Sequence, residues 1–221
     1  FEVVRRAGEA VRDRYGEIVF RFYFGLLYRD RIALGDPHPG NYLLSPDGRV
    51  CFLDYGLVRD VDPARVAAER EIALAVCARD ADAVKAALIT GGYLPAERAD
   101  AVDADLALRL MRIATKWYAV PGERRFSPDS ARRGRERDRA GARPGGEQRA
   151  AIKAQVNQFT VPPDSILIRR MHGIIAVVLG QLRAGGNWGA IAAEYLHGAA
   201  PATALGQAEA DYFERRGRAS H

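Results

Sequence analysis

The sequence is poor in cysteine and contains no long hydrophobic run. Cys51 and Cys77 are the only cysteines, too few for a disulfide framework or a thiolate zinc site. We expect both to be ordinary buried thiols in a reducing compartment. The longest apolar stretches, residues 18–20, 22–27 and 173–179, fall short of the roughly 18 to 20 residues that a bilayer crossing needs. The sequence therefore predicts no membrane span.

A secretory signal is also missing from the start of the sequence. Phe1 is followed neither by a charged segment nor by the apolar segment of a signal peptide. We expect a cytoplasmic protein of which this chain is a part, with further sequence upstream of Phe1.

The basic charge of the chain is concentrated in one segment. The net charge is +5, and residues 124–149 hold nine arginines against four acidic residues. The remaining 24 basic residues are balanced by 24 acidic ones. A nucleic-acid site should appear as a basic face on a folded element, so no nucleic-acid partner is predicted. Because this stretch has almost no large apolar group, residues 121–151 are predicted to be a disordered insertion.

Helical periodicity covers most of the chain outside that insertion. Residues 17–28 are apolar on nearly every side, so this helix should lie at the centre of the core. Trp117 and Trp188 are expected to be core anchors. The predicted organisation is a mainly α (α+β) chain with a core at residues 1–120, the insertion at 121–151 and C-terminal helices at 152–221. The predicted helices are residues 2–14, 17–28, 62–78, 81–89, 103–119, 164–183, 188–196 and 207–215.

Residues 32–56 are too interrupted by proline and glycine to be helical. The sequence DPHPGN at residues 36–41 predicts a loop, and residues 45–48 (SPDG) predict a tight turn. Short apolar runs at 42–44 and 50–53 flank that turn. The pattern therefore predicts a β-hairpin that ends at the triplet DYG, residues 54–56.

The spacing of polar residues around this hairpin indicates phosphoryl-transfer chemistry. Asp36 is followed five residues later by Asn41, and after thirteen more by Asp54. Transfer of a γ-phosphoryl group needs a carboxylate beside the attacking oxygen and oxygen ligands for Mg²⁺. We predict that Asp36 positions or deprotonates the nucleophile, that Asn41 and Asp54 hold the metal, and that Gly56 frees the backbone after the triplet.

Each of these residues also has a structural interpretation. Asp36 could cap the loop as an Asx turn, and Asn41 could brace it through backbone hydrogen bonds. His38 could contact a γ-phosphate or be packed between two prolines. On the long helix near the C-terminus, Arg169, Arg170 and His172 are expected to be solvated or to form an ion pair with a neighbouring helix.

The loop GDPHPGN at residues 35–41, with LDYG at 53–56, resembles the UbiB/ADCK family of atypical kinase-like proteins, also called aarF-domain-containing kinases. Residues 162–170 (PPDSILIRR) and 181–184 (QLRA) are similar to the C-terminal helices of this family. The resemblance implies a protein-kinase-like C-terminal lobe with a small catalytic hairpin, and an N-terminal nucleotide lobe that would precede Phe1. Two positions depart from the family pattern: Leu34 replaces a frequent histidine, which removes a polar support of the loop, and Tyr55 replaces phenylalanine.

The resemblance also implies what the complete protein does. It would be an enzyme that binds ATP and Mg²⁺ and hydrolyses ATP or transfers its phosphate, in support of isoprenoid quinone or lipid metabolism, with at most peripheral membrane contact. A small-molecule phosphotransferase of the aminoglycoside or choline kinase type, which has a similar loop, is one alternative. A catalytically silent kinase-like scaffold is the other.

Overall fold

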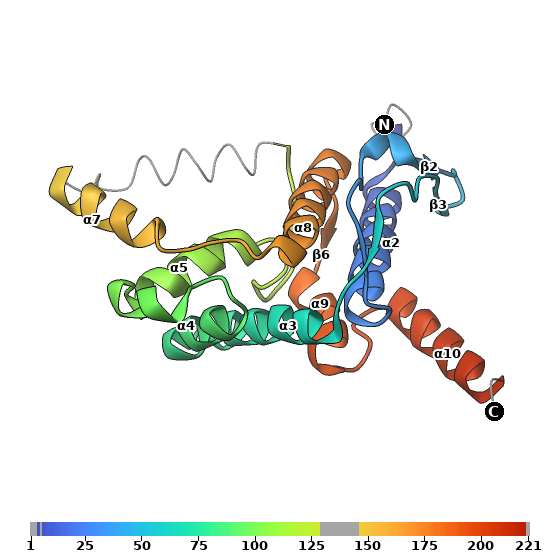
Figure 1. Cartoon of the computed structure of the whole chain (residues 1–221). Coiled ribbons are helices and arrows are strands. Elements are labelled where there is room, and N and C mark those ends of the chain that lie inside the picture. The colour runs from blue at the N-terminus through green and yellow to red at the C-terminus, as the bar shows by residue number, and fades with distance from the viewer. Residues whose placement is uncertain (1–3, 5, 129–145, 220–221) are drawn as a thin grey trace.

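The computed structural model describes residues 4, 6–128 and 146–219 (Figure 1). Helices dominate, and each strand has two or three residues. The helices are α2 (Glu9–Tyr28), α3 (Pro63–Ala78), α4 (Ala81–Thr90), α5 (Ala104–Thr115), α7 (Gly146–Val156), α8 (Pro163–Leu182), α9 (Trp188–His197) and α10 (Ala204–Ala219), with 3₁₀ turns η1 (Pro39–Asn41) and η2 (Ala96–Ala101). The strands are β1 (Ile32–Leu34), β2 (Tyr42–Leu44), β3 (Val50–Phe52), β4 (Val58–Asp60), β5 (Arg124–Arg125) and β6 (Gly185–Gly186).

Helix α2 lies at the centre of the core, as its apolar sequence predicts. It packs against α8 and α9, and Phe20 stacks on Phe24 with ring centroids 4.2 Å apart. Instead of a break between two predicted helices at residues 2–14 and 17–28, the helix is continuous from Glu9. Gly16 causes no break because it is a close-packing position, where an added Cβ would lie 2.3 Å from the Cβ of Ala184. Trp117 and Trp188 are buried core residues, as predicted.

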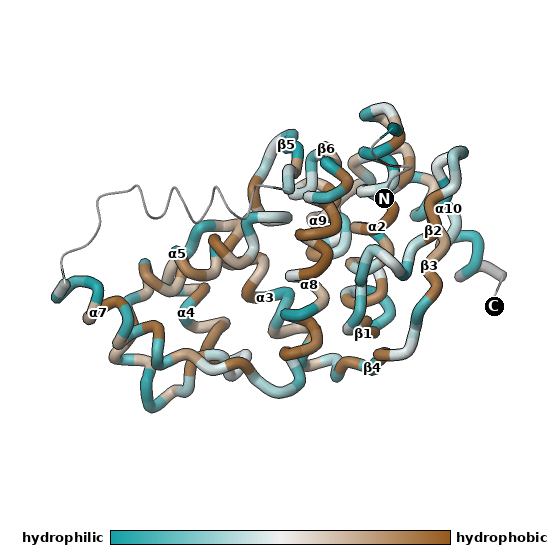
Figure 2. The backbone as a smooth tube through the Cα atoms, turned by 90° about the horizontal axis from the view of Figure 1, so that it is seen from above, coloured by the Kyte–Doolittle hydropathy of each residue, from teal (hydrophilic) through white to brown (hydrophobic). Residues whose placement is uncertain are grey.

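Helix α8 is the second element of this core. Its buried face includes Ile168, Met171 and Ile175, and Figure 2 shows the apolar stretches of α8 and α9 in the middle of the molecule. Among the described helices, α8 alone is long and apolar enough to cross a bilayer by length and composition, but half of its most apolar window is buried inside the protein. This burial is what a core helix requires.

Helices α3, α4 and α5 form a separate group around a second hydrophobic core (Figure 1). Aspartates cap the start of each helix: Asp62, Asp80 and Asp103 accept hydrogen bonds from backbone N–H groups two or three residues later. Arg79 ends α3 in the left-handed conformation, at φ 59°. Ile113 is 53% exposed, because it lies on the face of α5 turned away from this core.

The predicted hairpin is present, and a second strand pair encloses it. Strands β2 and β3 are antiparallel, with Tyr42 opposite Phe52. Strands β1 and β4 pair outside the hairpin, with Leu34 opposite Val58. The sequence did not predict this outer pair, which joins residues on either side of the loop, the hairpin and the triplet. It holds the two ends of the region together.

The predicted disordered insertion needs correction at both ends. Strand β5 pairs with β6, Phe126 is buried in the main core, and the guanidinium of Arg125 donates to the carboxylate of Asp13 at 2.7 Å. Residues 146–151 belong to α7. One aromatic side chain and one ion pair are enough to order the first flank despite its basic composition. The middle of the insertion, residues 129–145, lies outside the described residues.

The cysteines also differ from the prediction. Cys51 and Cys77 are free and exposed rather than buried. Cys51 lies on β3, whose neighbouring residues Val50 and Phe52 turn to the protein, so alternation along the strand places Cys51 toward solvent. Partial burial still raises the pKa of the Cys77 thiol.

Candidate functional site

The loop at residues 35–41 is held at its start by the outer strand pair. Immediately after β1, the backbone N–H of Gly35 donates to the carbonyl oxygen of Leu57 at 2.8 Å. Asp36 follows, and its side chain is 44% exposed. Leu34 is buried in the main core. Leu34 replaces a histidine that is frequent in the family, and the resemblance implies the loss of a polar support there. In this protein the apolar packing of Leu34 and the pairing of β1 with β4 support the loop instead.

Asn41 connects the loop to the strand that leads into the triplet. Its Nδ2 donates to the carbonyl oxygen of Asp36 at 3.0 Å. Its own carbonyl oxygen accepts the N–H of Leu53 at 2.9 Å, directly before Asp54. Asn41 therefore braces the loop, as its structural interpretation predicts, and the chain segments that carry Asp36, Asn41 and Asp54 are brought together.

Two buried tyrosines brace the middle of the loop. The hydroxyl of Tyr42 donates to the carbonyl oxygen of Pro37 at 2.7 Å and lies 3.1 Å from the hydroxyl of Tyr23 on α2. Burial raises the pKa of Tyr23 to about 12 and raises the pKa of Tyr42 further, so both hydroxyls stay protonated at neutral pH. The sequence does not predict this contact directly, but a tyrosine hydroxyl in the otherwise apolar strand β2 indicates that a buried hydrogen-bond partner is needed.

Asp54 is exposed and is the first residue of the triplet. Its Oδ1 accepts the backbone N–H of Gly56 at 2.7 Å, which leaves Oδ2 free of this turn. An added Cβ at Gly56 would lie 3.0 Å from Oδ1 of Asp54. A side chain at this position would therefore crowd the carboxylate that closes the turn, and the role predicted for Gly56 stays a prediction. Tyr55 is 54% exposed and points away from the core.

His38 is exposed and caps the short helix η1 rather than packing between the two prolines. Its Nδ1 accepts the N–H of Gly40 at 3.0 Å. This bond assigns the proton of a neutral imidazole to Nε2, which makes Nε2 a donor toward solvent or a bound anion. The packing interpretation of His38 is wrong, and its proposed contact with phosphate stays a prediction.

Comparison with known families supports the predicted resemblance. Residues 5–88 match the family model of the ABC1 atypical kinase-like domain. This ABC1 segment contains α2, both strand pairs, α3 and most of α4, and with them every residue predicted for the site.

Two relatives of the chain are similar to parts of it. An uncharacterized protein from Synechocystis is 38% identical over 73 residues, which are 33% of this chain and 17% of that protein. An uncharacterized aarF domain-containing protein kinase from Arabidopsis thaliana, described as chloroplastic, is 38% identical over 60 residues, which are 27% of this chain and 9% of that protein. The chain therefore matches less than a fifth of the length of these two relatives.

A solved structure shares the fold across nearly the whole chain. Rv3197 from Mycobacterium tuberculosis, determined in complex with erythromycin, aligns with a TM-score of 0.64 at 18% identity. The alignment covers 89% of this chain and 46% of the mycobacterial chain. The predicted mainly helical, kinase-like lobe is confirmed.

The donor atoms of the ABC1 segment suit a hard divalent cation. With Nδ2 of Asn41 committed to Asp36, the amide oxygen is left as its available donor, and no hydrogen bond within the described residues engages that oxygen. Asp54 offers the carboxylate oxygen that Gly56 does not use. Amide and carboxylate oxygens are ligands that Mg²⁺ accepts, with waters and phosphate oxygens completing its shell. The described residues contain no group of three or more His, Cys, Asp or Glu side chains that could form an all-protein cage.

Helix α8, outside the ABC1 segment, supplies a further residue to the site. Nε of Arg170 donates to the carbonyl oxygen of Gly35 at 2.7 Å, and Nη2 lies 3.6 Å from Oδ1 of Asp36. The guanidinium of Arg170 therefore contacts both the backbone just before Asp36 and the carboxylate of Asp36. The sequence predicts solvation of Arg170 or an ion pair with a neighbouring helix, but the partner of Arg170 is the loop.

The neighbouring residues of α8 face the protein interior. Arg169 forms an ion pair with Glu69 of α3, which confirms the expected pairing with a neighbouring helix. Glu69 is buried and also accepts hydrogen bonds from the hydroxyls of Tyr93 and Ser165. His172 is buried and stacks on Phe24, and burial lowers its pKa to about 3. These residues join α8 to α2 and α3 and so hold Arg170 in place.

Proposed function

We propose that the chain is the C-terminal lobe of an Mg-ATP-dependent kinase-like enzyme of the UbiB/ADCK type, an ATPase or a phosphotransferase. The observation that carries this proposal is the pair of hydrogen bonds made by Asn41. One bond joins Asn41 to Asp36 and the other joins it to the segment before Asp54. A carboxylate for the nucleophile and two oxygen donors for a metal are thereby presented by one hydrogen-bonded frame, as phosphoryl transfer requires.

The proposed roles follow from the donor and acceptor atoms that each side chain does not use within the loop. Asp36 holds or takes the proton of the attacking hydroxyl or water, and Arg170 orients this carboxylate. His38 directs its Nε2–H toward a phosphate oxygen. Asn41 and Asp54 hold Mg²⁺, and Gly56 keeps the turn that aims Asp54. Bound Mg-ATP would supply the phosphoryl group, and the metal would neutralise charge on the phosphates.

Three substitutions in the full-length protein test the proposal. We expect Asp54→Asn to lower ATP turnover at least about a hundredfold, because the amide loses the ionic ligand while keeping the shape of the side chain. Asn41→Ala should also impair turnover severely. Asp36→Asn should slow turnover and leave ATP affinity unchanged, because its role lies with the attacking oxygen.

Asp47→Asn is the matched control. Asp47 lies in the turn of the same hairpin and pairs with Arg49, so its substitution should leave turnover unchanged. If Asp54→Asn keeps full turnover, the catalytic assignment is wrong and a silent kinase-like scaffold is the better interpretation. Turnover only with an aminoglycoside or choline-like acceptor would favour the small-molecule phosphotransferase instead. Thermal melts of the same variants separate loss of chemistry from loss of fold.

We also propose that the complete protein supports isoprenoid quinone or lipid metabolism, in the cytoplasm and in peripheral contact with the membrane. The support for this is the family resemblance. Deletion of the gene should lower the cellular content of isoprenoid quinones or change the lipid profile. If the wild-type gene restores the quinone content or lipid profile and the Asp54→Asn gene does not, that role is connected to the site. An unchanged quinone and lipid content in the deletion strain would contradict the proposal.

A further inference from the structure

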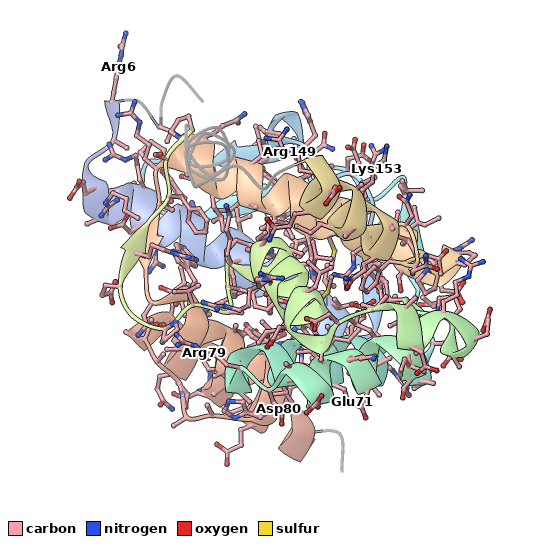
Figure 3. The ribbon with its side chains drawn as sticks, turned by 90° about the vertical axis from the view of Figure 1, so that its left-hand side faces the viewer. Arg6, Glu71, Arg79, Asp80, Arg149 and Lys153 are labelled. Atoms are coloured by element: carbon pink, nitrogen blue, oxygen red, sulfur yellow. The ribbon has the colours of Figure 1, made fainter. Side chains whose placement is uncertain are left out.

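A groove with an unbalanced positive charge lies at the far end of α3 from the candidate site. It has a volume of about 480 Å³ and runs between the end of α3, the outer face of α5 and the turn at residues 119–121. Figure 3 shows Arg79 at the end of α3, on the side of the molecule where α5 lies. Four basic side chains line the groove and no acidic residue does: Arg79, Arg109, Arg112 and Lys116.

These four cations differ from the other arginine groups of the protein. Arg21, for example, donates to the carboxylates of Glu17 and Glu194, and Arg125 donates to Asp13. Within the part of the chain that the structure describes, none of the four groove cations forms an ion pair or a side-chain hydrogen bond. Like charges that share one concave surface repel one another, and a bound anion removes that repulsion.

The positions of the cations favour a compact anion over a single carboxylate. Arg109, Arg112 and Lys116 follow one another at three- and four-residue spacing, so they line one face of α5 and its continuation. Arg79 approaches from α3, on the other wall. A group placed between the two walls would meet planar guanidinium donors from both sides, an arrangement that suits the several oxygens of a phosphate or diphosphate.

Apolar side chains lie beside the charged ones. Ile113 is 53% exposed and Val120 is 40% exposed, and both line the groove together with Val76 and Pro121. Exposed aliphatic groups next to unpaired cations fit a ligand that is itself divided into an anionic and an apolar part. The volume lies within the range of about 300 to 1,000 Å³ that is usual for small-molecule sites.

We propose that this groove binds a small phosphorylated ligand, with its phosphate or diphosphate between Arg79 and the basic face of α5 and its apolar part against Ile113 and Val120. The site is separate from the candidate phosphoryl-transfer site. The loop and the triplet precede the first residue of α3, whereas Arg79 follows the last, and a helix of 16 residues is about 24 Å long. The proposal therefore does not depend on the proposed function.

Calorimetric titration of the full chain with inorganic pyrophosphate tests the anionic half of the proposal. The buffer should contain a chelator, because without Mg²⁺ the Asn41 and Asp54 donors cannot retain the probe through a metal. We expect saturable binding that the double variant Arg112→Gln/Lys116→Gln weakens at least about tenfold, because it removes two charged hydrogen-bond donors. All four cations are exposed, so the double variant should fold normally.

Lys153→Gln is the matched control, because it removes one exposed cation from α7, away from the groove (Figure 3). Hexyl phosphate, below the concentration at which it forms micelles, tests the apolar half. Hexyl phosphate should bind more tightly than inorganic phosphate. Ile113→Ser should remove this difference in affinity without weakening the binding of pyrophosphate. Absence of pyrophosphate binding, or an equal loss in the control, would overturn the proposal. Binding only to vesicles of anionic phospholipid would indicate a membrane surface instead, and binding only to poly-glutamate would indicate an acidic protein partner.

Discussion

The helical core and the candidate site are built in opposite ways. In the core, Phe20, Phe24 and Ile175 are fully buried, and each buried side chain of this kind contributes about 1.5 to 3 kcal/mol to folding. At the site, Leu53, Tyr55 and Leu57 are about half exposed, and hydrogen bonds rather than packing define the geometry. Stability and candidate chemistry therefore reside in different parts of one lobe. Contacts of Arg170, Tyr42 and Leu34 are among those that join the two parts.

Trp188→Ala should have the largest effect and should act on stability alone. Trp188 is buried in contact with Phe20 and Phe126, so its removal leaves a cavity in the main core. We expect the free energy of unfolding to fall by about 3 to 5 kcal/mol. Chemical denaturation measures this loss. The matched control is Val177→Ala on α8, where the side chain is 53% exposed and the expected change is within about 0.5 kcal/mol.

The same variant tests whether the two regions are independent. ATP turnover per folded molecule of full-length Trp188→Ala should equal that of the wild type at temperatures well below its melting point. A loss of turnover with the fold retained would show that the core controls the site more directly than its contacts suggest.

His172 should make the core sensitive to acid. Burial lowers its pKa in the folded state to about 3, whereas the pKa in the unfolded chain is close to 6.5. Between pH 3 and pH 6.5, His172 is therefore protonated in the unfolded state and neutral in the folded state. The free energy of unfolding should be unaffected by this group above pH 6.5 and should fall by about 1.4 kcal/mol per pH unit as the pH drops from 6 to 4.

His172→Phe should remove that part of the pH dependence. The aromatic ring can still stack on Phe24, and the buried Nε2, which has no hydrogen-bond partner among the described residues, is lost. Denaturation curves at pH 7, 6, 5 and 4 would show a smaller slope in the variant. His197→Gln, at the exposed end of α9, is the control and should keep the wild-type slope. Equal slopes in wild type and His172→Phe would contradict the assignment.

Arg170→Lys should have the smallest effect and should act on the site alone. Lysine keeps the charge but cannot contact the carbonyl of Gly35 and the carboxylate of Asp36 with one planar group. In the full-length protein we expect the turnover number to fall about tenfold, a barrier increase of about 1.4 kcal/mol, with little change in the KM for ATP. The melting temperature should stay the same.

Two controls sharpen this test. Arg183→Lys makes the same change at the exposed end of α8 and should leave turnover unchanged. In an Asp36→Asn background, Arg170→Lys should lower the turnover number by a smaller factor than it does in the wild-type protein, because the partner of Arg170 has already been altered. Additive losses would indicate that Arg170 does not act through Asp36.

The sequence predicted the parts of this protein that depend on neighbouring residues. The turn at residues 45–48 and the apolar runs beside it predicted the hairpin, and Asp62 with Pro63 predicted the start of α3. Strands β1 and β4 were missed because the loop, the hairpin and the triplet lie between them in the chain, so no local turn indicates that they pair. Order at Arg125 and Phe126 was missed because the surrounding composition is that of a disordered segment.

By itself, the sequence determined the helical class, the hairpin, the ABC1 resemblance and the residue types of the site, because these follow from local periodicity, turn residues and motif spacing. Only the tertiary structure decided which atoms meet: Arg170 with Asp36, Tyr42 with Pro37, and four unpaired cations around one groove. The physical reason is that these contacts join segments far apart in the chain, and their existence depends on how α2, α3, α5 and α8 pack.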